Sequence, residues 1–385
     1  MESAIEKNTG IPPRGRQCIE EAIESAFKAK PTVLAYNKIN NKTEVTVCRV
    51  RFQLPDRTTH SLIAKHMPFN SDFFHGKNSC HPALQNELIA YEFLMHIREK
   101  FSLFPKLLGF SNGIMLLEDL GEDNFNFEDE TSAQEACIST FANLHACTSG
   151  KQSVYVDIEN KLKFSERGYR VLPFNDSGRH FELGWQYICS LAGPPGVKIN
   201  IGKETNNIQR MVQKPGVFYS FLHNDFLSRR QSIVKKGKFF LIDFEHSKFS
   251  HALLDFWQIY VGKIEYNIKK GIYFRKRFNY IHGMDSFYRK QFEDSAGRQI
   301  DEKEWQTHLY GILIYLSVCM IGNLLYMPYY LKACNGPLLP TVSFQQELKQ
   351  LLQFLQTSLS EKRIFAGSGK LFELCLQKLQ DKQHH

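Results

Sequence analysis

The spacing of apolar residues in the first third of the chain predicts two helices and two β-hairpins. Residues 16–29 and 81–101 carry apolar side chains three or four positions apart, which places them on one face of a helix. Residues 44–54 and 60–67 are rich in apolar and β-branched residues with turn-forming residues between them, and residues 104–123 contain two short apolar runs around Ser-Asn-Gly. The order helix, hairpin, helix, hairpin is typical of a small α+β lobe.

The rest of the chain predicts mainly helices. Residues 131–148 and 341–359 have the apolar spacing of a helix. Residues 150–215 show no sustained period and contain the loop-forming run Ala-Gly-Pro-Pro-Gly, so we expect irregular structure there. Residues 221–245 predict a hairpin, and from residue 253 onward we expect helices again.

One long stretch without charged residues, 309–331, has the length of a membrane span. Gly, Ser, Asn and Pro residues interrupt it, and no basic cluster flanks either end. The pattern favours a buried helix in the core of a large lobe, and no membrane span is expected.

Length and composition indicate a globular protein with more than one folding unit. A chain of 385 residues is too long for one small core, and 43% hydrophobic with 23% charged residues is ordinary for a globular protein. We expect an α+β fold with a loose N-terminus at residues 1–16, an N-lobe at 17–120 and a C-lobe at 121–385.

Cysteine usage points to a reducing compartment. The nine cysteines are odd in number and scattered, without a Cys-x-x-Cys pair or the density of a disulfide scaffold. The N-terminal residues contain no apolar segment of the signal-peptide type. Together these features predict a cytoplasmic protein.

Two candidate nucleotide contacts lie in the N-terminal part. Lys65 ends a predicted strand and Glu87 lies in the helix that follows, and a lysine held by a glutamate can reach the α- and β-phosphates of a nucleotide. The strand that ends at Glu118 and leads to Leu120 is a candidate hinge whose backbone can pair with an adenine edge. A solvated lysine, a glutamate on a helix surface and an ordinary strand end are the alternative interpretations.

Two aspartates follow predicted strands later in the chain. Asp225, in the loop sequence Leu-His-Asn-Asp, is placed to orient or deprotonate an attacking hydroxyl, and His223 is expected to support that loop. Asp243 follows the returning strand of the predicted hairpin, beyond a turn at Gly237, and is a candidate ligand for Mg²⁺. A hairpin with an acid at each end also arises by chance, but after a Lys…Glu lobe and a hinge-like strand it predicts phosphoryl transfer.

The order of these motifs resembles a known superfamily. The sequences AK, NELIAYEFL, LLEDLG, FANLHA, LHND and LIDFE, followed by HALLDF, are similar to those of the aminoglycoside phosphotransferase and choline kinase superfamily. These proteins are small-molecule kinases with a protein-kinase-like fold. The resemblance runs from Lys65 to about Tyr260 and does not identify the member.

The resemblance implies a bilobed fold with ATP bound in the cleft. It implies that Asp225 is the catalytic base, that Asp243 binds Mg²⁺, and that Lys65 contacts phosphate with Glu87 as its partner. By the same match Asp255 is a structural aspartate of the C-lobe.

The sequence departs from the family pattern in two places. The expected nucleotide loop, residues 36–47, contains no glycine. The family's metal-binding Asn comes five residues after the catalytic Asp, where this chain has Arg230. Either the loop is one residue longer and Gln231 supplies an amide oxygen to the metal, or Arg230 points into the cleft and replaces the charge of a second metal.

A basic, aromatic stretch at residues 263–290 carries eight Lys or Arg against two acids. Such a stretch can bind nucleic acid, but a helical hairpin with its charges in solvent is favoured, so a nucleic-acid partner is not expected. In the resembling family this region shapes the acceptor pocket, and a basic rim there suits a neutral or anionic acceptor.

The sequence therefore predicts an ATP- and Mg²⁺-dependent kinase that phosphorylates a hydroxyl group of a small molecule. The alternative is a pseudokinase-like regulatory or binding module that has lost catalysis, because the metal-binding Asn is absent from its expected position.

Overall fold

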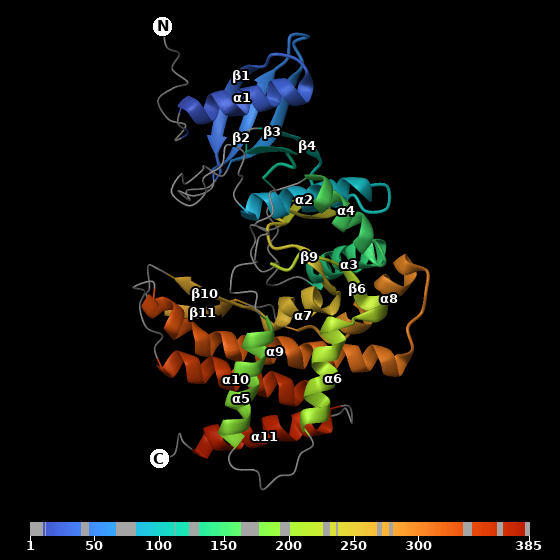
Figure 1. Ribbon diagram of the computed structural model, residues 1–385, viewed down its shortest axis with the longest axis vertical. Coiled ribbons are helices and arrows are strands. Elements are labelled where there is room, and N and C mark those ends of the chain that lie inside the picture. Colours follow the sequence, from blue (N-terminus) through green and yellow to red (C-terminus); the bar gives the residue numbers. More distant parts are fainter. Residues whose placement is uncertain are drawn as a thin grey trace. The chain divides into compact units, whose positions relative to one another are not determined.

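Figure 1 shows the computed structural model of the chain. The structure describes residue 11 and residues 13–39, 46–66, 82–111, 113–122, 131–162, 177–192, 201–225, 232–235, 238–267, 272–276, 280–333, 341–359 and 365–381. The predicted loose N-terminus lies mostly outside these residues.

The chain forms two compact units, each assembled from segments that are separated in sequence. The first unit comprises Met1–Phe125, Lys151–Gly168 and Ser228–Ser247, and the second comprises Asn126–Gly150, Tyr169–Leu227 and Lys248–His385. The first contains an antiparallel sheet and the second is mainly helical, so the predicted α+β class is confirmed. The division into lobes at residues 17–120 and 121–385 stays a prediction.

A five-stranded antiparallel sheet with the order β1-β2-β3-β5-β4 organises the first unit. Its strands are β1 (Thr32–Lys38), β2 (Thr46–Gln53), β3 (Thr59–His66), β4 (Leu107–Ser111) and β5 (Ile114–Glu118). Both predicted hairpins are present, whereas β1 was not predicted because most of its side chains are exposed and give no clean alternation.

Three helices belong to the first unit, namely α1 (Pro13–Phe27), α2 (Pro82–His96) and α4 (Gln152–Leu162). Helix α1 lies against the sheet (Figure 1) and contributes Ile19, Ala22 and Ile23 to the core that it shares with the strands. Helix α2 packs against α4 and β4. A separate hairpin of β7 (Ser232–Lys235) and β8 (Lys238–Leu241) completes the described part of the unit.

The second unit is built around helix α9 (Glu302–Ala333), which packs against α5, α6, α7 and α10. The other helices of this unit are α3 (Thr131–Thr148), α5 (Ser177–Ala192), α6 (Ile201–Gln213), α7 (Leu253–Val261), α8 (Met284–Ala296), α10 (Thr341–Leu359) and α11 (Ala366–Asp381). The bounds of α3 and α10 are those that the apolar spacing predicts.

Helices α5 and α9 cross at a point where only glycine fits (Figure 1). A Cβ atom on Gly322 would lie 1.8 Å from the carbonyl oxygen of His180, and one on Gly184 would lie 2.0 Å from that of Val318. The glycine that interrupts the uncharged stretch of the sequence therefore allows two backbones to approach closely.

Helix α9 contains the one membrane-span candidate found among the described residues. Its window Glu302–Leu325 is long and apolar enough to cross a bilayer, and 72% of that window is buried inside the protein. Burial by four neighbouring helices is what the sequence interpretation as a core helix predicts.

Two sequence-based expectations about the later part of the chain are wrong. Residues 150–215 are not irregular, because helices α4, α5 and α6 occupy most of their described part. Helix α6 is mostly polar, and the loop-forming run at residues 192–196 separates α5 from α6 in the sequence, which drew attention away from the helices on either side.

The basic stretch at residues 263–290 does not form a helical hairpin. It forms a β-hairpin of β10 (Lys263–Asn267) and β11 (Ile272–Lys276), followed by α8. The runs Lys-Ile-Glu-Tyr-Asn and Ile-Tyr-Phe-Arg-Lys are rich in Ile, Tyr and Phe, which favour strands over helices.

Candidate active site

A buried ion cluster in the first unit joins three of the predicted site residues. Lys65 Nζ on β3 donates to Glu87 Oε2 on α2 at 2.5 Å and to Asp243 Oδ1 at 2.6 Å. Lys65 is 6% exposed and Glu87 is 1% exposed. A lysine that is removed from water in this way needs charged partners, and here two carboxylates meet one ammonium group.

The electrostatics of this cluster keep Lys65 positively charged. Burial lowers the pKa of Lys65, but the nearby carboxylates of Glu87, Asp243 and Glu245 outweigh it and raise the pKa above its ordinary value. Burial raises the pKa of Glu87 to about 8, against the opposing effect of Lys65. Near neutral pH Glu87 is therefore mostly protonated, and the Lys65 ammonium group is balanced by the Asp243 carboxylate.

Asp243 is held in an unusual backbone conformation two residues after β8. Its φ of 68° lies in the left-handed region, which costs energy for a residue with a side chain and is common at functional sites. Its side chain is 32% exposed, in contrast to that of Glu87. The Asp243 carboxylate can therefore be reached from solvent while it remains bound to Lys65.

Helix α2 also fixes the turn that follows Asp243. Asn86 Nδ2 donates to the carbonyl oxygens of Glu245 at 2.9 Å and Ser247 at 3.0 Å. The ring of Tyr91, one turn after Glu87, meets the buried ring of Phe244 edge to face. Sequence reasoning assigned no role to Asn86 or Tyr91, although both lie in the motif NELIAYEFL, Asn86 directly before Glu87 and Tyr91 one turn after it on the same helix face.

The predicted hairpin that leads to Asp243 is formed by β7 and β8, but the strand that leads to Asp225 is not part of it. Strand β8, which leads to Asp243, pairs with β7 in the first unit. The strand before Asp225 is β6 (Tyr219–Leu222), which pairs with β9 (Lys248–His251) in the second unit. The sequence pattern identified β6 but could not identify its partner, because pairing between distant strands leaves no local signal.

Two predicted features fall outside the described residues. Gln231 and Arg230, the alternatives for the second metal position, both lie there, as do residues 40–45 of the expected nucleotide loop. Their predicted roles stay predictions.

The segment after β5 is anchored by side chains of the neighbouring strands. Asp119 accepts hydrogen bonds from Arg49 Nε on β2 at 2.8 Å, from Ser61 Oγ on β3 at 2.5 Å and from the backbone N–H of Gly121 at 3.0 Å. Burial raises the pKa of Asp119, but these hydrogen bonds outweigh it and hold the pKa below its ordinary value. The predicted hinge residues Glu118 and Leu120 thus flank an anchored aspartate that sequence reasoning missed.

In the second unit, Asp225 follows β6 on a loop that is fixed by Asp255. The backbone N–H groups of His223 and Asn224 donate to Asp255 Oδ2 at 2.7 Å and Oδ1 at 2.8 Å. Asp255 is fully buried on α7, and Asn224 has a φ of 59°. The loop therefore satisfies its buried donors with a side chain instead of a neighbouring strand.

His145 on α3 forms a further contact to the same carboxylate. Its Nε2 lies 3.1 Å from Asp255 Oδ2, and its Nδ1 lies 2.7 Å from the hydroxyl of Tyr288 on α8. His145 belongs to the motif FANLHA, which the sequence analysis used for the resemblance without giving the histidine a role.

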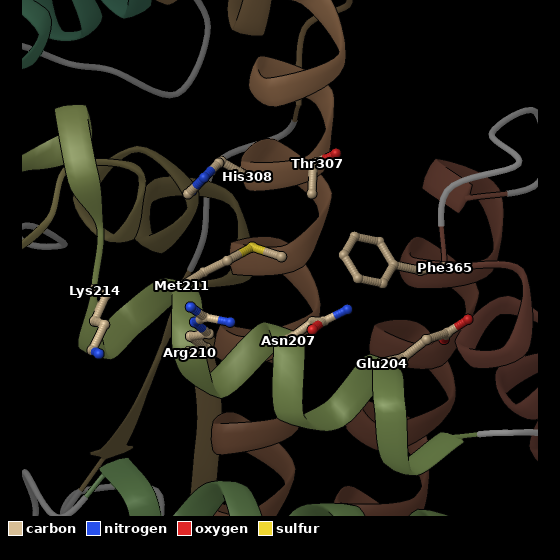
Figure 2. Close-up of a pocket in the computed structure, with 8 residues that line it drawn as sticks. All are labelled: Glu204, Asn207, Arg210, Met211, Lys214, Thr307, His308 and Phe365. Atoms are coloured by element: carbon tan, nitrogen blue, oxygen red, sulfur yellow. The ribbon is translucent and has the colours of Figure 1, made fainter.

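A surface hollow of about 460 Å³ lies between α6 and α9 in the second unit (Figure 2). It is lined by Glu204, Asn207, Arg210, Met211, Lys214, Thr307, His308 and Phe365. The Glu204 carboxylate already accepts the backbone N–H groups of Gly367 and Ser368. None of the lining residues was a predicted site residue.

Comparisons with known proteins reveal distant structural similarity. No protein-family model matches the chain, and no curated protein matches it. An aminoglycoside phosphotransferase from Alicyclobacillus acidocaldarius is 11% identical, with 92% of this chain and 93% of that chain covered and a TM-score of 0.47. An ethanolamine kinase from Plasmodium vivax is 12% identical, with coverages of 90% and 81% and a TM-score of 0.45.

The choline kinase LicA from Streptococcus pneumoniae is also similar, at 15% identity, with 89% of this chain and 99% of that chain covered and a TM-score of 0.43. The matched structures come from the superfamily that the sequence motifs resemble. Because these TM-scores lie below 0.5, the roles proposed below depend on contacts within this chain.

Proposed function

We propose that this chain is an ATP- and Mg²⁺-dependent phosphotransferase that phosphorylates a hydroxyl group of a small molecule. The observation that carries the proposal is the buried cluster of Lys65, Glu87 and Asp243. Glu87 on the helix holds the buried ammonium group of Lys65, which is the candidate phosphate contact. The partly exposed Asp243, which also pairs with Lys65, is the candidate metal ligand.

The proposed roles follow from the contacts. Lys65 binds the α- and β-phosphates of ATP, and Glu87 holds its ammonium group in place. The backbone around Glu118 and Leu120, anchored through Asp119, pairs with the adenine edge. Catalysis then comes from positioning and charge stabilisation, without a covalent enzyme intermediate.

Asp225 is the proposed base that orients and deprotonates the acceptor hydroxyl. Asp255 supports this role because it fixes the two backbone N–H groups that immediately precede Asp225. His223 supports the loop through its backbone N–H group, which donates to Asp255. The acceptor is proposed to be neutral or anionic, as the basic residues 263–290 suggest.

The Asp243 carboxylate fits Mg²⁺, because it is a hard oxygen ligand and is partly exposed. Gln231 is the proposed second ligand. When bound, Mg²⁺ neutralises charge on the transferred phosphoryl group. We also propose a cytoplasmic location, since the described cysteines are free thiols.

The test is ADP release from ATP across a library of small hydroxyl compounds, with Asp225→Asn beside the wild type. We expect turnover by the wild type and a loss of at least 100-fold in the variant, because a positioned base contributes about 10²–10⁴-fold. Asp294→Asn, which changes an exposed aspartate of the same unit, is the matched control and should keep full turnover. Full turnover by Asp225→Asn would refute the assignment.

A pseudokinase-like regulatory or binding module without catalysis is the second candidate, favoured by Arg230 at the position of the expected Asn. A thermal shift with ATP, with and without Mg²⁺, separates the two. Stabilisation that requires Mg²⁺ supports the enzyme, and no ADP release together with no shift at millimolar ATP supports the inactive module.

A further inference from the structure

A buried chain of hydrogen bonds runs from α8 to the loop that carries Asp225. Tyr288 Oη lies 2.7 Å from His145 Nδ1, His145 Nε2 lies 3.1 Å from Asp255 Oδ2, and that carboxylate accepts the backbone N–H groups of His223 and Asn224. The side chains of Tyr288, His145 and Asp255 are all fully buried. Each of these side chains therefore depends on its neighbour in the hydrogen-bonded series for its own hydrogen bonds.

The direction of these hydrogen bonds depends on which of the three side chains can donate a proton and which can only accept one. An ionised Asp255 can only accept, so His145 donates its Nε2–H to it. In a neutral imidazole Nδ1 is then the acceptor, and the Tyr288 hydroxyl must donate to it. Burial raises the pKa of Tyr288 well above its ordinary value, with the charge of Asp255 as a further cause, so the hydroxyl keeps its proton.

We propose that Tyr288 is a positioning residue that fixes the orientation of the His145 ring and, through Asp255, the loop that carries Asp225. This inference rests on the proposed function only where it concerns turnover. It gives a role to a residue of the basic aromatic stretch 263–290, which the sequence offered only as a nucleic-acid contact, a solvated face or an acceptor rim.

Simple packing is the competing explanation, because the Tyr288 ring also contacts Phe256, Phe292 and Trp305. Packing needs the ring, whereas positioning needs the hydroxyl. Tyr288→Phe keeps the ring and removes only the hydroxyl. Tyr280→Phe is the matched control, because Tyr280 donates to Asp285 at 2.7 Å and stacks on Trp257 without joining the chain to Asp255.

The first measurement is the ¹⁵N NMR spectrum of His145 in protein labelled at histidine. The wild type should show a proton on Nε2 and none on Nδ1, and Tyr288→Phe should shift the Nδ1 resonance, because that nitrogen loses its hydrogen-bond donor. A proton on Nδ1 in the wild type would overturn the proposal even if the variant fails to fold. An unchanged spectrum in a folded Tyr288→Phe protein would also overturn it.

The second measurement is amide hydrogen exchange of His223 and Asn224, with turnover recorded on the same samples. In Tyr288→Phe both amides should exchange about tenfold faster, and kcat should fall about tenfold with the KM for ATP unchanged. Tyr280→Phe should leave all of these values at the wild-type level.

The outcomes separate the two proposals. Faster exchange in Tyr288→Phe without turnover by the wild type would support the positioning role and refute the proposed function. A fall in kcat without a change in the His145 spectrum or the exchange rates would refute the positioning role alone.

Discussion

At the scale of single residues, Lys65 shows how a charge is kept inside a sheet. Its ammonium group has exchanged water for two carboxylates, one fully buried and one partly exposed. The pair with Glu87 is costly to break from one side, because the remaining partner is left buried and uncompensated.

Lys65→Met should lower the free energy of unfolding by about 3 kcal/mol, because it leaves Glu87 buried without its cation. Adding Glu87→Gln should recover part of this loss, since the buried acid left without its partner is then removed. Urea-induced unfolding of the two single variants and the double variant measures both effects.

Lys38→Met provides the control for this cycle, because it removes an exposed lysine from β1 of the same sheet and should change stability by less than about 0.5 kcal/mol. A Lys65→Met variant as stable as Lys38→Met would contradict the structural importance of the cluster.

Sequence reasoning could predict part of this site and not the rest. A lysine at a strand end and a glutamate inside the next helix are a recognisable combination, and the structure places the two side chains in contact. The bond between Arg49 and Asp119 spans 70 residues and has no local signal. The left-handed backbone of Asp243 was also invisible, because no glycine or asparagine marks it.

At the scale of elements, the crossing of α5 and α9 depends on the absence of side chains. Gly322→Ala should lower the free energy of unfolding by about 3 kcal/mol, because its Cβ would lie 1.8 Å from a backbone oxygen that cannot move aside cheaply. Thermal unfolding followed by circular dichroism measures the change.

Gly202→Ala serves as the matched control, since nothing lies within 4 Å of a Cβ at that helical position. It should be neutral or slightly stabilising, by up to about 1 kcal/mol. Equal effects of the two substitutions would mean that the close approach of α5 and α9 is not required.

The helices α3 and α10, which are rich in apolar residues, were predictable, and the more polar helix α6 was not. The bounds of α3 and α10 follow directly from their apolar spacing. Helix α6 has few buried positions, so the sequence offers little to detect. In β10 and β11 the many charges suggested a solvated helix, whereas the Ile, Tyr and Phe residues between them determine the strands.

At the scale of the whole molecule, two neighbouring histidines in the second unit should make stability depend on pH. His251 Nε2 lies 2.8 Å from His308 Nδ1. Burial lowers the pKa of His251 well below its ordinary value, with His308 and His145 as further causes, and burial lowers the pKa of His308 to about 4. In the unfolded chain both side chains bind protons below about pH 6.5.

Stability from these groups is therefore fully present above pH 6.5 and lost as the pH falls, because the unfolded chain then binds more protons than the folded one. Between pH 7 and 5 the loss from His308 should be about 2 kcal/mol, and His251 should add to it. His308→Asn should reduce the loss by about 2 kcal/mol in urea unfolding at the two pH values. His282 is exposed, so His282→Asn should leave the pH-dependent loss of stability unchanged. An equal loss in His308→Asn and His282→Asn would contradict the prediction.

The interleaved composition of the two units has a consequence for biosynthesis. The first unit needs residues as late as Ser247, and the second begins at Asn126. A nascent chain that ends before Asp243 has made Lys65 and Glu87 but lacks the second carboxylate of their cluster. Complete folding of the first unit must therefore wait until Ser247 has left the ribosome, and neither unit can be excised as one continuous gene fragment.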